Sequence, residues 1–217
     1  SNNVPMSGDY TVGQLAIYTR ITDAVNDLNA RGQLGAVRFL LVDANYTSET
    51  LPIIIQNSTA SPSNTLTIQP NTGVTSNITG SSSSGIFNIA THYVTINGDN
   101  LGGSVGRNLT IRNTSVAANS YVIGLFNFGT SLTASNCTIK NNNLFGGVNW
   151  GIVLNNSGGN FDNVVIDNNQ IQRTNIGIQF AGVSGATSDN GKITNNEMGS
   201  SIDSLSIFRR GILTSYT

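Results

Sequence analysis

The stretch Cys137-Thr-Ile-Lys-Asn-Asn142 returns 27 residues later as Val164-Val-Ile-Asp-Asn-Asn169. Related phrases stand at 109–113 and 192–196, which puts the central isoleucines 28, 27 and 27 residues apart. A glycine followed by an aliphatic residue recurs alongside them, at Gly124, Gly151, Gly177 and Gly211. A fixed period of this length indicates one supersecondary unit that is stacked on copies of itself.

Such a unit has room for three short strands and three bends, and neighbouring units would lie at the ordinary strand spacing of ~4.8 Å. A sandwich of sheets needs alternating side chains but no register of this kind. We therefore expect an all-β fold, a right-handed parallel β-helix of six to seven coils over residues 36–217. The repeated isoleucines would fill one inward column, namely Ile111, Ile139, Ile166 and Ile193. A second inward column would hold Ile86, Leu125, Ile152, Ile178 and Ile212.

Residues 1–35 are expected to precede the coils as a lead-in and an N-terminal capping helix. Residues 1–13 have no clear pattern, whereas apolar residues at helical spacing predict a helix over 14–31. These residues are Leu15, Ile17, Ile21, Val25 and Leu28. The helix would cover strand edges and apolar groups of the first coil. Because a new coil begins at Gly211, close to the last residue, we expect a single structural domain that is incomplete at its C-terminal end.

In each repeated phrase an asparagine follows the central isoleucine by two positions. These residues are Asn113, Asn141, Asn168 and Asn195. Asparagine tolerates the left-handed backbone of a sharp bend, and its amide can bond to the equivalent amide one coil away. We therefore predict a structural asparagine ladder, and ligand binding by these amides is the alternative.

The composition excludes several classes of protein. Only 10% of the residues are charged and the net charge is −1, so we expect no nucleic-acid partner. No apolar run approaches the ~18 residues of a membrane span. Polarity comes instead from amides and hydroxyls, with 31 asparagines against two lysines. The single cysteine, Cys137, excludes an intrachain disulfide and takes an apolar core position in its repeat.

Several segments carry a family resemblance. They are Tyr93-Val-Thr-Ile-Asn-Gly98 followed by Arg107-Asn-Leu-Thr-Ile-Arg-Asn113, and the N-terminal pieces 28–32, 39–44 and 46–47. With these segments the chain resembles the right-handed parallel β-helices of the pectate-lyase-like superfamily. More narrowly, it resembles β-helix segments of large secreted surface proteins of Bacteroidota and related bacteria. The resemblance implies the fold and a helical N-terminal cap, but it leaves the activity open because this fold hosts lyases, hydrolases, adhesins and stalks.

Catalytic chemistry has little support in the sequence. A β-helix lyase would need carboxylates that converge on calcium, and an Arg or Lys base. The available carboxylates are Asp162, Asp167, Asp189, Glu197 and Asp203. Repeat alignment instead places Arg112, Lys140, Asp167 and Thr194 in one outward column, where Lys140 and Asp167 would form an exposed ion pair. The only histidine, His92, has no carboxylate in its local pattern. We therefore expect no metal, no cofactor and no catalytic residues.

Aromatic residues near the bends are the candidates for ligand contact. They are Tyr121, Phe145, Trp150 and Phe161. Aromatic rings can stack on sugar rings, so these residues would contact a polysaccharide or a cell-surface glycan. Packing in the core or at the edge of a coil is the alternative.

The sequence favours a non-enzymatic, extracellular or cell-surface β-helix module, with a structural or adhesive role and weak glycan binding. A polysaccharide lyase or hydrolase with an unfamiliar site is one alternative. A self-assembling subunit is another, in which the open C-terminal end meets a second copy; further coils of a longer chain would fill the same place.

Overall fold

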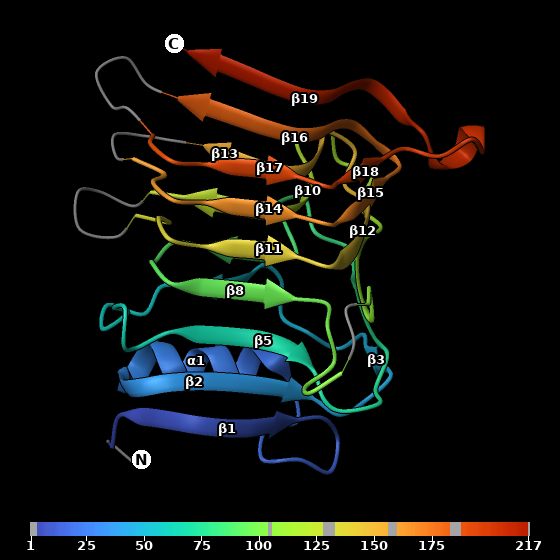
Figure 1. The fold of residues 1–217 in the computed structure, drawn as a ribbon. Helices are drawn as coiled ribbons and strands as arrows, with labels where there is room; N and C mark the ends of the chain where they lie inside the picture. The colour runs from blue at the N-terminus through green and yellow to red at the C-terminus, as the bar shows by residue number, and fades with distance from the viewer. Residues whose placement is uncertain (1–3, 104–105, 128–132, 156–159, 183–187, 217) are drawn as a thin grey trace.

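A computed structural model describes residues 4–103, 106–127, 133–155, 160–182 and 188–216. In these residues the chain winds into a parallel β-helix with three parallel sheets, one of seven strands and two of six (Figure 1). We name them sheets A, B and C in the order in which the chain visits them. The predicted parallel β-helix with an N-terminal helix is confirmed, with about six turns.

From β2 onward, each turn contributes one strand to each sheet. Sheet A contains β1 (Met6–Val12), β2 (Gln33–Leu41), β5 (Leu66–Pro70), β8 (Val94–Asn97), β11 (Thr138–Lys140), β14 (Val165–Asp167) and β17 (Lys192–Thr194). Sheet B contains β3 (Asn45–Tyr46), β6 (Ser76–Gly80), β9 (Leu109–Asn113), β12 (Asn142–Gly146), β15 (Gln170–Gln172) and β18 (Glu197–Met198). Sheet C contains β4 (Ile53–Ile55), β7 (Phe87–Ile89), β10 (Tyr121–Phe126), β13 (Trp150–Asn155), β16 (Thr174–Gly182) and β19 (Ile207–Tyr216).

The core consists of apolar columns in which each side chain lies in register with its counterpart one turn away. The column of sheet A is Phe39, Ile68, Ile96, Ile139, Ile166 and Ile193. The column of sheet B is Tyr46, Ile78, Ile111, Leu144, Ile171 and Met198. The column of sheet C is Ile53, Phe87, Ile123, Ile152, Ile178 and Ile212. Burial of each such side chain contributes about 1.5–3 kcal/mol, so the columns are the main source of stability.

The predicted first column was wrong in one member. Ile111 lies opposite Leu144 in sheet B, whereas Ile139 pairs with Ile96 in sheet A. The reason is that the segment 98–108 carries the chain from sheet A to sheet B. The phrase at 109–113 therefore belongs to a different sheet from the phrases that it resembles.

The predicted second column was partly wrong. Ile152, Ile178 and Ile212 do lie in register, but their counterparts are Ile123 in β10 and, in β7, Phe87 rather than the predicted Ile86. Leu125 lies two positions further along and is opposite Leu154. Gly124 is followed by a leucine, just as the later glycines are followed by isoleucines. The repeats were aligned on this glycine, which placed β10 two residues out of register.

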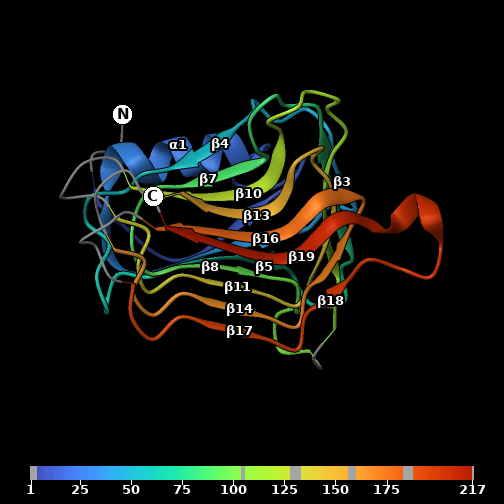
Figure 2. The ribbon, with the colours of Figure 1, turned by 90° about the horizontal axis from the view of Figure 1, so that it is seen from above.

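The N-terminal lead-in is more regular than expected. Residues Met6–Val12 form strand β1, which extends sheet A by pairing with β2. The following residues do not begin a helix at 14, because Leu15 is fully exposed and the helix α1 spans Ile21–Arg31. Helix α1 packs beside β4 and covers that edge of sheet C (Figure 2). The first turn thus consists of a strand in sheet A and a helix at the edge of sheet C.

The N-terminus of α1 is stabilised from outside the helix. Glu49 accepts hydrogen bonds from the backbone N–H groups of Ile21 and Thr22, at 3.0 and 2.7 Å. A carboxylate at this end satisfies free donors and opposes the positive end of the helix dipole. This contact fixes α1 to the segment between β3 and β4.

The predicted asparagine ladder is confirmed for Asn141 and Asn168. Asn195 shares their left-handed bend but donates its amide to Asp167, and the fourth predicted member was wrong. Asn141, Asn168 and Asn195 have φ values of 60°, 51° and 53°, as a left-handed bend between sheets A and B requires. Asn168 Nδ2 donates to Asn141 Oδ1 at 2.8 Å. Asn113 lies elsewhere, at the end of β9 and opposite Gly146, because its phrase belongs to sheet B.

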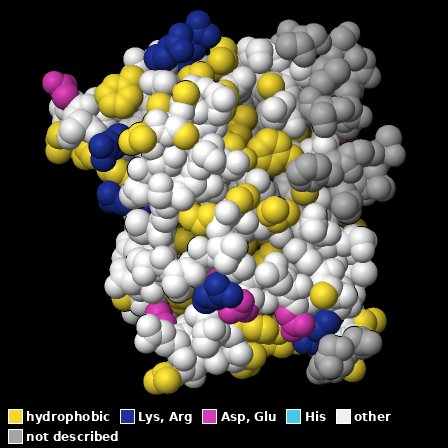
Figure 3. All heavy atoms as spheres, turned by 180° about the vertical axis from the view of Figure 1, so that it is seen from behind, with side chains coloured by type: hydrophobic (Ala, Val, Ile, Leu, Met, Phe, Trp, Pro, Cys, Tyr) yellow, Lys and Arg dark blue, Asp and Glu magenta, His cyan; other side chains and the backbone are white. Residues whose placement is uncertain are grey.

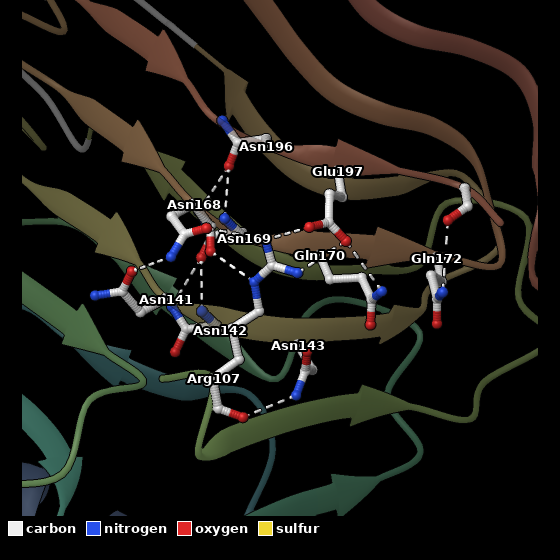
Figure 4. A network of polar contacts seen from close by, with 11 residues as sticks. Arg107, Asn141, Asn142, Asn143, Asn168, Asn169, Gln170, Gln172, Asn196 and Glu197 are labelled. Atoms are coloured by element: carbon white, nitrogen blue, oxygen red, sulfur yellow. Dashed lines mark hydrogen bonds and ion pairs between the residues drawn. The ribbon is translucent and has the colours of Figure 1, made fainter. Parts of the chain in front are cut away.

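A second row of amides runs inside the first. We call it the inner ladder; it consists of Asn142, Asn169 and Asn196 (Figure 4). Each Nδ2 donates to the Oδ1 of the next residue in the row at 3.0 Å, and that Oδ1 also accepts the backbone N–H of the previous one. The inner ladder is buried at Asn142 and Asn169, so it fixes the register of successive turns.

Candidate functional site

A hollow of about 360 Å³ lies on the outer face of sheet C, where side chains of β10, β13 and β16 meet. We call it the aromatic hollow, because three aromatic residues line it: Tyr121, Phe126 and Trp150. The polar residues of its lining are Ser83, Ser84, Asn119, Asn155 and Gln179. Figure 3 shows this face of the molecule, with hydrophobic side chains gathered in its middle among polar ones.

Two glycines provide the space in which the rings lie. A Cβ atom at Gly124 would stand 2.2 Å from Phe126 Cε2 and 2.7 Å from Tyr121 Cε2. A Cβ atom at Gly85 would stand 2.3 Å from the same carbon of Tyr121. Both rings therefore cover the backbone of the sheet directly.

The position of Tyr121 is fixed by a partner one turn away. Its hydroxyl donates to Asn88 Oδ1 at 2.9 Å, and Asn88 is the residue opposite Gly124. The rings of Tyr121 and Phe126 pack with their centroids 5.7 Å apart at an interplanar angle of 58°. Burial raises the pKa of the Tyr121 hydroxyl, so this group remains a neutral donor at physiological pH.

The aromatic hollow also contains polar atoms without partners. Trp150 Nε1 and Gln179 Oε1 are buried, and neither has a hydrogen-bond partner among the residues that the structure describes. Buried polar atoms are almost always paired in folded proteins. One free donor and one free acceptor beside an aromatic surface are the groups that a sugar hydroxyl can satisfy after a small side-chain movement.

The structure separates the four aromatic residues that the sequence suggested. Tyr121 and Trp150 both line the aromatic hollow, whereas Phe145 lines a different one. Phe161 was wrong as a ligand contact, because it is fully buried and packs edge-on against Phe180 with centroids 5.8 Å apart. Its place at the bend before β14 turns the ring into the core.

Phe126 and Gln179 belong to the aromatic hollow but were not predicted. Phe126 is at the end of β10, three positions after the inward Ile123, and it lies on the outer face of the sheet. An outward aromatic residue in a strand is the signal that could have identified it. Gln179 follows the inward Ile178 in the same way, but a single polar residue on an outer face is unremarkable in a sequence.

A second hollow, of about 230 Å³, lies where sheet B turns toward sheet C. We call it the arginine hollow. The guanidinium of Arg112 lies over the ring of Phe145, 3.9 Å from the centroid, and that of Arg173 is 5.8 Å from the same centroid. Such contacts are cation–π interactions. Gly146, Gly147 and Phe208 also line this hollow.

Several carboxylates contact groups on other turns of the β-helix. Within the described ranges, no three residues among His, Cys, Asp and Glu lie close enough together to hold a metal ion. Asp189 donates its backbone N–H to Asp162 Oδ1 at 2.8 Å, and Glu197 pairs with Arg107. The first contact links successive turns, as the amides of the ladders do, whereas the second joins turns that lie further apart.

The predicted outward column is confirmed for Lys140, Asp167 and Thr194, which lie in register. The predicted ion pair between Lys140 and Asp167 was wrong, since the four ion pairs of the described residues do not include it. Arg112 was wrong as its fourth member, since it lies opposite Phe145 in sheet B. Asp167 Oδ1 accepts hydrogen bonds from the Thr194 hydroxyl at 2.7 Å and from Asn195 Nδ2 at 2.9 Å. The bond from Thr194 is the main reason that the pKa of Asp167 is lowered.

Of the remaining reactive side chains, Cys137 is buried and His92 is half-buried. Burial lowers the pKa of His92, whose Nδ1 lies 3.4 Å from the hydroxyl of Thr133. Burial raises the pKa of the Cys137 thiol to about 12. A thiol with such a pKa is not a nucleophile at physiological pH, so Cys137 has the core role that its repeat position predicts.

In the described part of the chain, no helix has the length and apolar character needed to cross a membrane. The chain matches no known family model, no curated protein sequence and no solved structure.

Proposed function

We propose that this chain is a non-enzymatic β-helix module of an extracellular or cell-surface protein, which acts as a rigid segment and contacts glycans through the aromatic hollow. The observation that carries the proposal is the grouping of Tyr121, Phe126 and Trp150 over one outer face of sheet C. The likeness to pectate-lyase-like β-helices and to surface proteins of Bacteroidota-type bacteria, expected from the sequence, is part of the same proposal.

The chemistry of the hollow suits a neutral sugar. Among the described residues that line it none is charged, and its hydroxyl and amide groups can exchange hydrogen bonds with sugar hydroxyls. Stacking of a sugar on an aromatic ring requires an exposed apolar surface bounded by such groups. A shallow site of this kind binds weakly on its own, and repeated contacts along a polymer raise the overall affinity.

The single tryptophan of the chain makes the proposal directly testable, because Trp150 lines the hollow. Its fluorescence is titrated with cello-, xylo- and manno-oligosaccharides. We expect a saturable change with at least one of them. In Phe126→Ala the change should be lost, whereas in Phe208→Ala, which removes an exposed ring outside the aromatic hollow, it should remain. A flat titration with every sugar, or equal behaviour of the two variants, would reject the proposal.

Contact through the C-terminal turn is a second candidate function. Ile212 is 48% exposed although its counterparts in sheet C are buried, and Ile193 and Met198 are only partly covered. Either a second copy or further coils of a longer polypeptide would cover these side chains. Sedimentation velocity over a wide concentration range tests the first possibility. Self-association that Ile212→Lys abolishes would support it, and a monomer at every concentration would exclude it.

A further inference from the structure

The arginines of the chain fall into two groups. Arg20, Arg31, Arg38 and Arg107 each form an ion pair with an Asp or Glu. In the described residues the other four form no ion pair; they are Arg112, Arg173, Arg209 and Arg210. Two of these line the arginine hollow, and the other two directly follow Phe208, which lines it as well. Figure 3 shows Lys and Arg side chains, in dark blue, at the upper left of the face that is viewed from behind.

Register explains why the two guanidinium groups meet at one ring. Arg112 in β9 lies opposite Phe145 in β12, and Phe145 lies opposite Gln172, the residue before Arg173. The ring of Phe145 therefore has one cation from the preceding turn and one from the following turn. The described residues that line the arginine hollow include no carboxylate to neutralise them.

The floor of the hollow is made of glycine. Gly146 and Gly147 have φ values of 85° and 73°. A Cβ atom at Gly146 would stand 2.1 Å from the carbonyl oxygen of Asn113, and one at Gly147 would stand 2.7 Å from Tyr121 Cα. The backbone at these two glycines therefore lies close against the backbone of the preceding turn. This close approach leaves the hollow open beside the two arginines. Ser115 and Asn175 add a hydroxyl and an amide to the lining.

Two like charges that share a hollow without a counter-ion gain from an anion that binds both. A guanidinium group donates two parallel hydrogen bonds to a carboxylate, sulfate or phosphate group. The apolar side chains of Phe145 and Phe208 would contact the sugar ring to which the anionic group is attached. The volume of the hollow lies below the ~300–1,000 Å³ of sites for drug-sized molecules, so it suits one charged sugar unit of a longer polymer.

We infer that the arginine hollow is an anion site, which binds a sulfate or carboxylate group on a polysaccharide. This site differs from the proposed site for neutral sugars in place and in chemistry. The two hollows flank the same turn, because Gly147 and Val148 line one and Trp150 lines the other. One polymer with both charged and neutral units can therefore contact them together.

Affinity electrophoresis tests the inference in native gels that contain dextran sulfate, polygalacturonate or uncharged dextran. We expect retardation by at least one of the two anionic polymers, weaker at high salt, and none by dextran. The sulfate and carboxylate arms show which group is preferred.

The decisive variant is Arg112→Gln combined with Arg173→Asn. Asparagine is chosen at position 173 because Arg173 has a φ of 57°, and asparagine adopts this conformation readily. The matched control is Lys140→Gln combined with Lys192→Gln, which also removes two charges but takes them from sheet A, away from the arginine hollow. We expect the double variant to lose roughly tenfold or more in affinity, and the control to lose little. Circular dichroism confirms that both are folded, and Arg173→Asn alone gives a second measurement if the double variant is not.

Absence of retardation in both anionic gels would overturn the inference. Equal retardation of the double variant and the control would overturn it too, because the interaction would then depend on net charge alone. The fluorescence of Trp150 with neutral sugars is a separate readout, so failure of either site is distinguishable from failure of the other.

Discussion

Arg107 pairs with Glu197, which lies 90 residues further along the chain. The distance between Arg107 Nη1 and Glu197 Oε2 is 2.9 Å, and Arg107 Nε also donates to the backbone carbonyl of Asn168 at 2.9 Å (Figure 4). Arg107 precedes β9 and Glu197 begins β18, so this side chain reaches past β12 and β15 in sheet B. It holds four turns of the β-helix at fixed spacing.

The first prediction concerns the pH dependence of this contact. The hydrogen bond from Arg107 is the main reason that the pKa of Glu197 is lowered. The resulting stabilisation is present above the unfolded-state pKa of the carboxyl group, and it is lost as the pH falls through the lowered folded-state pKa. Arg107→Met should therefore reduce the free energy of unfolding more at neutral pH than at pH ~3. Urea unfolding at the two pH values measures the difference.

Lys192→Met is the control for that experiment, because Lys192 is an exposed cation that forms no ion pair with the residues that the structure describes. Its effect should not change with pH. An identical loss for Arg107→Met at both pH values would show that the charge of Glu197 does not contribute.

The second prediction concerns the centre of the inner ladder. Asn169→Ala would remove the acceptor of the Asn142 backbone N–H and the donor to the Ile139 carbonyl, both inside the protein. Each buried group left unpaired costs about 1–3 kcal/mol, so we expect a loss of about 3 kcal/mol in the free energy of unfolding. Chemical denaturation measures it.

The control for the ladder is Asn163→Gly. Asn163 also bonds to an asparagine one turn away, Asn136, at 3.0 Å, but this contact is exposed. Its φ of 55° suits glycine, so the backbone is not strained. The loss should stay below ~1 kcal/mol. Equal losses in the two variants would show that burial of the inner ladder does not matter.

The third prediction concerns the aromatic hollow. In Gly124→Ala the new methyl group would displace the rings of Phe126 and Tyr121. We expect a stability loss of only about 1 kcal/mol, because side chains rather than backbone must move. Sugar binding and the emission of Trp150 should nevertheless change. Gly191→Ala is the matched control, since its Cβ would meet only the Val164 carbonyl oxygen at 3.8 Å. Unchanged sugar binding in Gly124→Ala would contradict the role of the rings.

The fourth prediction concerns Cys137, which is the only thiol of the chain. Its burial and its pKa of about 12 make it unreactive in the folded protein. A thiol reagent should modify it in denaturant and leave it intact in buffer. Rapid labelling under native conditions would show that the turn containing β11 opens readily.

The sequence repeat was sufficient to predict the fold, because a β-helix places the same residue type at the same point of every turn. Ile139, Ile166 and Ile193 are therefore recognisable without a structure. The repeat does not show, however, to which sheet a phrase belongs. The segment between Ile96 and Ile111 moves the chain to sheet B, and nothing in the phrase at 109–113 records that change.

The site was harder to predict for a related reason. Trp150 and Tyr121 were recognisable as aromatic residues near bends, but their neighbours depend on which strands are adjacent. The pairing of Arg112 with Phe145 arises between turns, and the sequence alignment had placed this arginine beside Lys140. Phe161 shows the opposite error, because a ring at a bend can turn inward as well as outward.

The inner ladder and the strand pairs share one direction, since both connect each turn to the next. Mechanical load along the rod would therefore act on these bonds one turn at a time. A repeat of 27 residues that peels away would lengthen the chain by about 90 Å. Under tension the protein is expected to extend in discrete steps of that size. Side-chain contacts that cross several turns, such as those of Arg107 with Asn168 and Glu197, would set the force at which the steps begin.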